Sequence, residues 1–302
     1  MEFGKLHDIN GVDFTMPEDH PLTSVVLSRN KQEQGVKFTV GCPAWSCKEW
    51  QGKIYPPGLK PKDFLEHYAR HFSNIELNST HYGIPKDETI LRWKESVPDG
   101  FQFCPKVPQK ISHWNRLERV AVETEDFCRA MGLLGDKLGV SFMQLPPNFT
   151  PNEFGKLAHF IENFPTEIPL SIEFRHEEWF LNDAIFQEIT ERMESRGIST
   201  VITDVAGRRD VLHQRLTTPI AVIRFVGNRL DITDYRRLDD WVVRLKDWIS
   251  QGLKEVYFFL HQPSDVLCPE AVIYFVNEVN KALGLNLEVP KMLNTGVQKS
   301  LF

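Results

Sequence analysis

The stretch that decides the fold is residues 37–78, which begins with KFTVG (37–41), passes through PKDFLEHYARHF (61–72) and ends with NIELN (74–78). The two outer segments are short apolar runs typical of buried strands, whereas the middle segment places Phe64, Leu65, Tyr68 and Phe72 on one face of a helix. Pro61 suits the first turn of that helix. The stretch therefore predicts a strand–helix–strand unit with parallel strands.

The same alternation continues along the rest of the chain. Further strand segments begin at residues 101, 139, 170, 199, 220 and 255, and helical segments separate most of them; only the connection 204–219 lacks a helical pattern. Eight such units predict an α/β protein built as a (β/α)8 TIM-type barrel. We expect a single domain over residues 37–284, with an N-terminal extension (1–36) and an irregular C-terminal tail (285–302). An open doubly wound sheet is the alternative, but its G-x-G-x-x-G turn is missing after the first strand.

The composition excludes several classes of protein. The chain has 302 residues, of which 41% are hydrophobic and 25% charged, as expected for a soluble globular protein, and its net charge of -6 does not favour a dominant nucleic-acid surface. Five cysteines without a C-x-x-C pair predict a reduced, cytoplasmic protein. MEFGKLHDING (1–11) does not resemble a signal peptide, and no apolar run approaches the roughly 20 residues of a membrane helix.

Polar side chains mark the carboxyl ends of seven consecutive predicted strands, where a barrel places its active site. In strand order they are Glu76 with Asn78, Lys106, Gln144, Glu173 with Arg175, Asp204, Arg224 and His261. We expect a small-molecule site in which Glu76, Glu173 and Asp204 are catalytic and the other residues bind substrate. The alternative is a structural network of ion pairs, for example Glu173 with Arg224 or Lys106 with Glu76.

Aromatic residues occur in the loops that follow the predicted strands. Trp45, Tyr82, Trp114 and Trp179 follow the first, second, third and fifth strands. Aromatic walls above a charged floor suit a sugar or a base, and we expect Trp45, Tyr82 and Trp179 to contact substrate. The alternative is that these rings only plug the top of the barrel.

Several chemistries are compatible with these residues. Glu76, Glu173, Asp204 and His261 could bind a divalent metal, but Lys106, Arg175 and Arg224 bring three positive charges into the same space. A pair of carboxylates also suits glycoside hydrolysis. Metal-free acid–base chemistry on an anionic or polyhydroxylated substrate fits best, with the cations holding the anion. The contrasting class is a non-catalytic protein that binds nucleic acid, which the acidic net charge does not favour.

Four sequence blocks, taken together and in order, resemble the pattern of a known protein family. The opening VGCPAWSCKEWQGKIYPP (40–57), IELNSTHYGIP (75–85), LGDKLGVSFMQLPPNF (134–149) and SIEFRHEEWF (171–180) resemble, in this order, blocks of the YecE-like family, the domain of unknown function 72. The resemblance extends to about residue 284 and implies a (β/α)8 barrel, in agreement with the strand count. It implies no established activity, although a distant likeness to barrel nucleases and sugar isomerases is the usual suggestion.

The chain departs from the family pattern at a few positions near the strand ends. Pro43 and Ala44 replace the usual Ser-Gly before the first tryptophan, and Val226 replaces a histidine after the arginine of the seventh strand. His261 and Gln262 stand where the family usually carries asparagines. We therefore expect contacts at strand eight that differ from those of the family.

Overall fold

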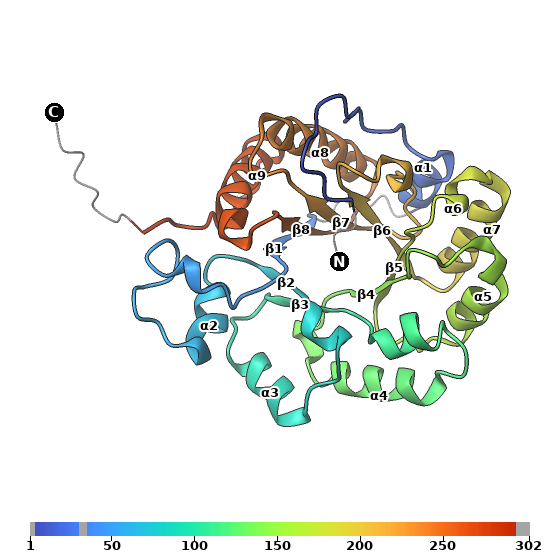
Figure 1. The fold of residues 1–302 in the computed structure, drawn as a ribbon, viewed down its shortest axis with the longest axis horizontal. Coiled ribbons are helices and arrows are strands. Elements are labelled where there is room, and N and C mark those ends of the chain that lie inside the picture. The colour runs from blue at the N-terminus through green and yellow to red at the C-terminus, as the bar shows by residue number, and fades with distance from the viewer. Residues whose placement is uncertain (1–3, 30–34, 294–302) are drawn as a thin grey trace.

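The computed structural model describes residues 4–29 and 35–293, and its centre is a single parallel sheet. The strands are β1 (Lys37–Cys42), β2 (Asn74–Leu77), β3 (Gln102–Pro105), β4 (Ser141–Gln144), β5 (Leu170–Glu173), β6 (Ser199–Asp204), β7 (Ile220–Val226) and β8 (Glu255–His261). They pair in the order β3-β2-β1-β8-β7-β6-β5-β4 (Figure 1). All eight strands occur where the sequence predicts them.

The two ends of this sheet, β3 and β4, meet and close the barrel. Only two isolated bridges join them, Phe103 with Leu138 and Lys106 with Phe142. Pro105 lies between the bridges and has no N–H to donate, which explains why the ladder is interrupted there. The expected (β/α)8 TIM-type fold is confirmed, with its weakest pairing between β3 and β4.

Helices surround the sheet (Figure 1). The α-helices are α1 (Pro21–Ser28), α2 (Phe64–Tyr68), α3 (Asp87–Glu95), α4 (Ala121–Gly132), α5 (Phe154–Asn163), α6 (Glu178–Leu181), α7 (Asp183–Ser195), α8 (Ile232–Gln251) and α9 (Cys268–Leu283). Short 3₁₀ turns cover residues 48–50, 61–63, 78–81, 135–137, 151–153, 209–211 and 265–267, and a π-helical turn covers Lys110–Trp114. Within the described ranges, no helix is long and apolar enough to cross a membrane.

The connection between β6 and β7 contains only a 3₁₀ turn, and helix α1 of the N-terminal extension lies beside it. Figure 1 shows α1 between α8 and the α6–α7 pair. The Thr23 hydroxyl donates to the Gln214 carbonyl at 2.7 Å and accepts from the Leu216 N–H at 3.0 Å, and Trp248 Nε1 donates to Asp19 at 2.9 Å. The extension thus supplies a helix at the position that the β6–β7 connection leaves open.

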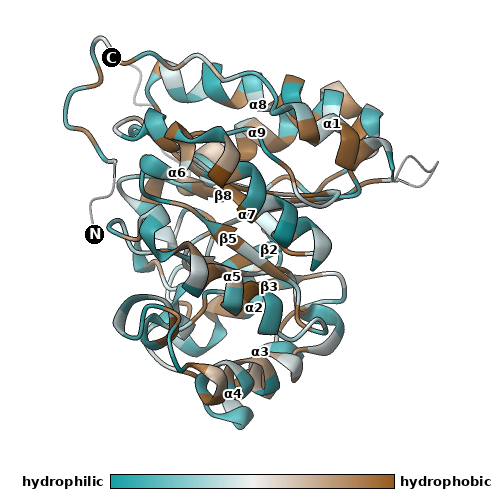
Figure 2. Ribbon diagram, turned by 90° about the vertical axis from the view of Figure 1, so that its right-hand side faces the viewer, coloured by the Kyte–Doolittle hydropathy of each residue, from teal (hydrophilic) through white to brown (hydrophobic). Residues whose placement is uncertain are grey.

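Apolar side chains fill the barrel on both sides of the sheet. Figure 2 shows strands such as β5 and β8 mostly in the hydrophobic colour, whereas the helices carry both colours. The barrel interior holds a compact cluster that consists of Cys104, Val140, Phe142, Val201, Val222, Tyr257 and Phe259. A larger cluster lies between the sheet and the helices. The interior cluster forms a floor below the carboxyl ends of the strands, and a cavity lies above it.

The segments outside the barrel run along its surface. The Gly207 N–H donates to the Gly4 carbonyl at 2.8 Å, which places the first described residues beside the end of β6. At the other end, α9 stops at Gly284, whose φ of 66° is left-handed, and residues 285–293 continue without helix or strand. The Leu293 N–H donates to the Lys53 carbonyl at 2.7 Å. The rest of the expected tail, 294–302, lies outside the described residues.

Candidate functional site

A cavity of about 600 Å³ opens at the carboxyl ends of the strands. Its lining from the strands and the residues that directly follow them consists of Lys106, Gln144, Arg175, Thr203, Val205, Arg224, Val226, His261, Gln262 and Pro263. Loops and the N-terminal segment add Lys5, His81, Tyr82, Gln109, His113 and Asp265. The cavity lies where a (β/α)8 barrel presents its site.

Glu76, at the end of β2, is fully buried under this cavity and accepts hydrogen bonds from three side chains. Arg224 donates to it through Nε and Nη2, both at 2.9 Å. Asn78 Nδ2 lies 2.9 Å from one carboxylate oxygen and His261 Nε2 lies 2.8 Å from the other. The sequence correctly predicted that Glu76 and Asn78 lie together, and the fold adds Arg224 and His261 from β7 and β8.

Glu173, at the end of β5, is the second buried carboxylate. Arg224 Nη1 donates to it at 2.7 Å and Gln144 Nε2 donates at 2.8 Å. Arg175 Nε lies 3.5 Å from its other oxygen. The ion pair of Glu173 with Arg224 that the sequence suggested is therefore present, and one guanidinium joins both carboxylates.

Lys106, which follows β3, lies on the opposite side of the same cluster. Its side chain is 8% exposed, and its Nζ donates to Gln144 Oε1 at 2.9 Å and lies 5.7 Å from the centre of the Phe142 ring. No carboxylate of the described residues forms an ion pair with it, so the suggested pair of Lys106 with Glu76 does not form. Lys106 is held by a neutral amide.

The charges in this cluster shift the pKa of each group. Burial alone would raise the pKa of Glu76, but the positive charge of Arg224 and the contact with His261 hold it well below its usual value. For Glu173, burial is again outweighed, here by Arg224 and Arg175, and the pKa is lowered. Burial and the charge of Arg224 lower the pKa of Lys106 to about 8. At neutral pH both carboxylates are ionised, and Lys106 is the cation that gives up its proton most readily.

Two histidines and a tyrosine line a second wall of the cavity. The rings of His81 and His113 meet edge to face, with their centres 5.0 Å apart, and the ring of Tyr82 lies 5.5 Å from that of His81. His81 Nδ1 lies 2.9 Å from the Val107 carbonyl, which can only accept, so that His81 Nε2 carries the lone pair. Burial lowers the pKa of both histidines to about 4, which keeps them neutral at pH 7.

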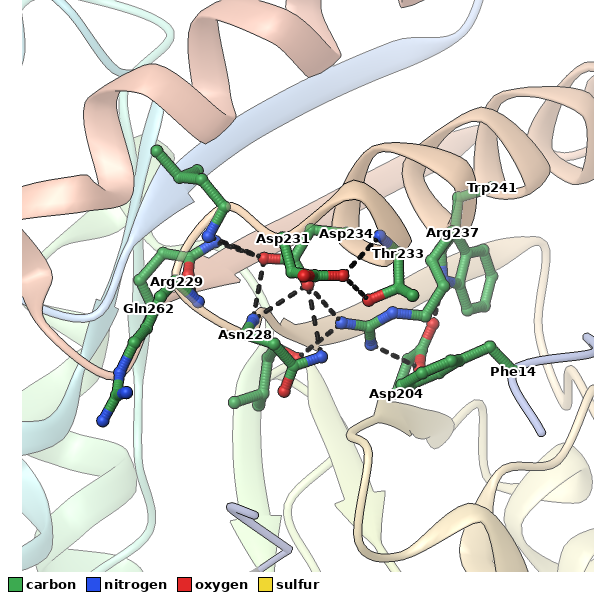
Figure 3. Close-up of polar contacts among 12 residues, drawn as sticks. Phe14, Asp204, Asn228, Arg229, Asp231, Thr233, Asp234, Arg237, Trp241 and Gln262 are labelled. Atoms are coloured by element: carbon green, nitrogen blue, oxygen red, sulfur yellow. Dashed lines mark hydrogen bonds and ion pairs between the residues drawn. The ribbon is translucent and has the colours of Figure 1, made fainter. Parts of the chain in front are cut away.

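Asp204 does not belong to this cluster, contrary to our expectation of a catalytic role. Val201 faces the barrel interior and Thr203 lines the cavity, so the side chain of Asp204 points to the other face of β6. There it accepts hydrogen bonds from Arg237 Nη1 at 2.9 Å and Trp241 Nε1 at 2.8 Å, as Figure 3 shows. The inward-facing residue of this strand end is Thr203, which a correct phase for the alternation along β6 would have indicated.

Two of the three expected aromatic contacts also lie outside the lining of the cavity. Trp179 is fully buried, donates to the Phe149 carbonyl at 2.8 Å and packs among the phenylalanines behind β5. Trp45 packs edge to face on Trp93, with ring centres 5.6 Å apart. Tyr82 does line the cavity, with 76% of its surface exposed. Both tryptophans belong to the apolar packing around the sheet, whereas the alternative that the sequence left open placed them at the top of the barrel.

Other residues of the cavity were not predicted from the sequence. Lys5 reaches it from the N-terminal extension, and a smaller cavity of about 330 Å³ continues from Lys5 towards Arg229 after β7. Thr203 is 4% exposed, and its hydroxyl has no hydrogen-bond partner among the described residues. Nothing in the pattern around Lys5 marks it as a site residue, because only the folding of the extension brings it to the strand ends.

The expected donors for a divalent metal are not assembled. Asp204 points away, and the carboxylates of Glu76 and Glu173 are occupied by Arg224. Within residues 4–29 and 35–293, no group of three His, Cys, Asp or Glu side chains is arranged to hold a metal ion. The five cysteines are buried and free, and burial raises the pKa of Cys47 to about 12. The divalent-metal site that the sequence suggested from Glu76, Glu173, Asp204 and His261 is therefore not formed by these residues.

Comparison with known proteins places the chain among uncharacterised relatives. Residues 39–293 match the family model described as "Protein of unknown function DUF72". The chain is 33% identical to the UPF0759 protein YecE of Escherichia coli (strain K12) over 263 residues, which cover 81% of this chain and 93% of that protein. It is 26% identical to the UPF0759 protein YunF of Bacillus subtilis (strain 168) over 165 residues, which cover 52% and 57% of the two chains.

Solved structures agree with the fold. A DUF72 family protein from Thermotoga maritima MSB8 superposes with a TM-score of 0.62 at 25% identity, covering 82% of this chain and all (100%) of that one. A DUF72 family protein from Enterococcus faecalis V583 superposes with a TM-score of 0.63 at 21% identity, covering 83% and 99%. The N-terminal extension (1–36), which carries Lys5 and α1, precedes the region matched by the family model.

Proposed function

This chain belongs to the DUF72 family of proteins of unknown function, and from that premise we propose that its barrel cavity binds a small anionic, hydroxylated molecule and performs acid–base chemistry on it. The observation that carries the proposal is an excess of buried positive charge at the carboxyl ends of the strands. Three buried cations, Lys106, Arg175 and Arg224, stand beside two buried carboxylates, Glu76 and Glu173, and the exposed Lys5 and the partly buried Asp265 add one charge of each sign to the lining. A buried charge without a partner is costly, and an anionic ligand would supply the partner.

Arg175 and Lys106 are the cations best placed to hold that anion. Arg224 already donates hydrogen bonds to Glu76 and Glu173, so it orients these carboxylates and is less available to a ligand. Arg175 is 5% exposed and lines the cavity, and a guanidinium suits carboxylate and phosphate groups equally. The Thr203 hydroxyl, which lacks a partner in the described residues, suits a hydroxyl group of the ligand.

Proton transfer falls to His261 and Lys106 in this proposal, rather than directly to Glu76 and Glu173. Both carboxylates are ionised and held by Arg224, so they are poor proton donors at neutral pH. Glu76 instead orients His261 through the 2.8 Å contact with Nε2, which leaves Nδ1 as the atom that exchanges a proton. Asn78 and Gln144 hold the two carboxylates in place.

The other functions that the sequence suggested gain less support. A metal-assisted nuclease or isomerase would need the donors that Asp204 and the paired glutamates do not supply. A protein that binds nucleic acid would carry a basic surface, whereas the cations here lie inside a cavity of about 600 Å³. A small-molecule site explains both the enclosure and the charge.

Calorimetric titration with inorganic phosphate and ribose 5-phosphate tests the proposal. We expect binding by the unaltered chain, and at least a tenfold loss of affinity in Arg175→Gln, because the anion loses its guanidinium. Arg192→Gln, on the outer surface of α7, is the matched control and should bind normally. Glu173→Gln distinguishes a role of this carboxylate in ligand binding from a role in stability. A loss of stability with unchanged phosphate binding would give Glu173 a purely structural role, whereas no binding of either probe by the unaltered chain, or unchanged binding in Arg175→Gln, would contradict the proposed site.

A further inference from the structure

We propose that Lys106 Nζ is a nucleophile that forms an imine with an aldehyde or ketone group of the substrate. This inference rests on the proposed function, since it assigns the substrate to the class of anionic carbonyl compounds, such as keto acids and sugar phosphates. It adds a covalent step that neither the family match nor the anion-binding proposal requires.

The position of Lys106 is fixed by its backbone. Its N–H donates to the Leu77 carbonyl at 3.2 Å, and its carbonyl accepts the Thr80 hydroxyl at 2.7 Å. The bridge to Phe142 ties the same residue to β4. Lys106 is thus held between β2 and β4 at the closing seam of the barrel, and its side chain lines the cavity. A rigid mounting of this kind suits a group that must meet a reacting atom.

A second buried lysine shows what is unusual about Lys106. Lys137 is also 8% exposed, but its Nζ donates to the carbonyls of Lys94 and Val97 at 3.0 and 2.7 Å and lies 3.7 Å from Asp99. Those oxygens stabilise the ammonium form. Lys106 has one neutral oxygen, from Gln144, and forms no ion pair with any described residue. Lys106 and Lys137 are therefore equally buried, but the surroundings of Lys137 stabilise a positive charge and those of Lys106 do so much less.

The neighbours of Lys106 favour the neutral amine that nucleophilic attack needs. Burial, together with the nearby charges of Arg224 and Arg175, lowers its pKa to about 8, although Glu173 and Glu76 act in the opposite direction. A lysine that is desolvated beside other cations is one of the recognised forms of an activated amine. Close to pH 8, about half of the molecules would carry a free lone pair on Nζ.

The proposed step is balanced without any redox partner. The neutral amine attacks the carbonyl carbon, the Nζ–C bond forms and the C–O bond breaks. The oxygen leaves as water with the two protons that the amine gives up. His261 lines the same cavity and can relay these protons, while Arg175 holds the anionic group of the substrate. The resulting imine withdraws electrons from the adjacent carbon and favours proton removal there.

Reductive trapping on the full chain tests the proposal. The protein is incubated with pyruvate, dihydroxyacetone phosphate or ribose 5-phosphate in the presence of sodium cyanoborohydride, which reduces an imine to a stable secondary amine. Intact mass and peptide mapping then identify the modified lysine. We expect a single adduct on Lys106 with at least one probe, at a rate that rises with pH and has its midpoint near 8, as the pKa of Lys106 requires.

Variants make the result decisive. Lys106→Met and Lys106→Arg should abolish the adduct, and Arg retains the charge if Met perturbs folding. Lys137→Met, altered at an equally buried lysine, should leave the adduct unchanged. Labelling spread over exposed lysines, or no adduct in a chain that still binds phosphate through Arg175, would overturn the imine and leave the proposed function intact. Failure of both phosphate binding and trapping would overturn both.

Discussion

Two buried ionic networks lie at the same end of the barrel, and they use their charges differently. The inner network consists of Glu76, Glu173, Arg224, Arg175 and Lys106 and borders the cavity. The outer network consists of Asp204, Asp234, Arg209 and Arg237 and lies between the sheet and α8. The outer network balances its two carboxylates with two arginines, whereas in the inner network Lys106 forms no ion pair with a carboxylate of the described residues.

Arg237 connects the members of the outer network. It donates to Asp204, to Asp234 and to the Val226 carbonyl at 2.9, 2.9 and 3.1 Å, and its guanidinium lies 4.3 Å from the centre of the Phe225 ring. Figure 3 shows Phe14 of the N-terminal extension on the same group. The extension, the sheet and α8 are thus joined through one side chain.

The carboxylate of Asp234 accepts the backbone N–H groups of the loop after β7, the loop that often binds a phosphate in other barrels. This carboxylate accepts the N–H groups of Asn228, at 2.7 and 2.8 Å to its two oxygens, and of Leu230, at 3.0 Å (Figure 3). These contacts hold Arg229 and Leu230 at left-handed φ values of 64° and 60°, which are costly outside glycine. The loop amides are therefore already satisfied, and ligand recognition is left to the side chains of the inner network.

The largest effect is expected from Arg237→Met, which leaves Asp204 and Asp234 buried without their shared cation. Removal of one member of a buried ionic group costs about 3–5 kcal/mol, so we expect a loss of that size in the free energy of unfolding, measured by urea denaturation. Arg236→Met, at an exposed neighbour on α8, is the control. Equal losses in both variants would refute a central role of Arg237.

Lys106→Met should raise the free energy of unfolding at pH 7, whereas Arg237→Met lowers it. Lys106 is charged at pH 7 although burial and the charge of Arg224 disfavour the ammonium form. Replacement of Lys106 by Met therefore removes an electrostatic cost of about 1–3 kcal/mol to the folded state. Lys137→Met should instead destabilise, because it orphans the carbonyls of Lys94 and Val97. Denaturation of the three proteins in parallel checks both signs, and a destabilised Lys106→Met would contradict this view of the inner network.

The stability advantage of Lys106→Met should shrink as the pH rises. The pKa of Lys106 is about 8 in the folded chain and about 10.4 in an unfolded one. Between these values the unfolded chain binds more protons, so the unaltered protein gains stability with rising pH and the variant does not. Unfolding measured from pH 7 to 10.5 tests this directly. A difference that stays constant over this range would mean that the pKa of Lys106 is unperturbed.

The smallest effect is expected beside the outer network, at the exposed start of α8. Asp231 caps this helix by accepting the Thr233 N–H and hydroxyl, both at 2.9 Å. Asp231→Ala should cost about 1 kcal/mol, the usual value of such a cap. Asp126→Ala, on the exposed face of α4, should change stability by less than half as much. Thermal unfolding of the two variants suffices, and equal shifts would argue against the capping role.

The sequence alone determined the barrel and much of its charged site. Each strand of a parallel barrel is a short apolar run followed by a helix or turn, so the local pattern in residues 37–78 already contained the repeating unit. Residues such as Glu76, Glu173 and Arg224 could be listed because every strand of a parallel barrel ends at the same face.

The tertiary structure decided what those residues do. Alternation along a strand gives a period of two but not its phase, so only the fold could turn Asp204 outward and Thr203 inward. The pair of Glu76 with Arg224 spans 148 residues of sequence. Lys5 reaches the cavity only because the extension folds back beside β6 and β7. Charge pairing depends on distances in space, and no local pattern contains those distances.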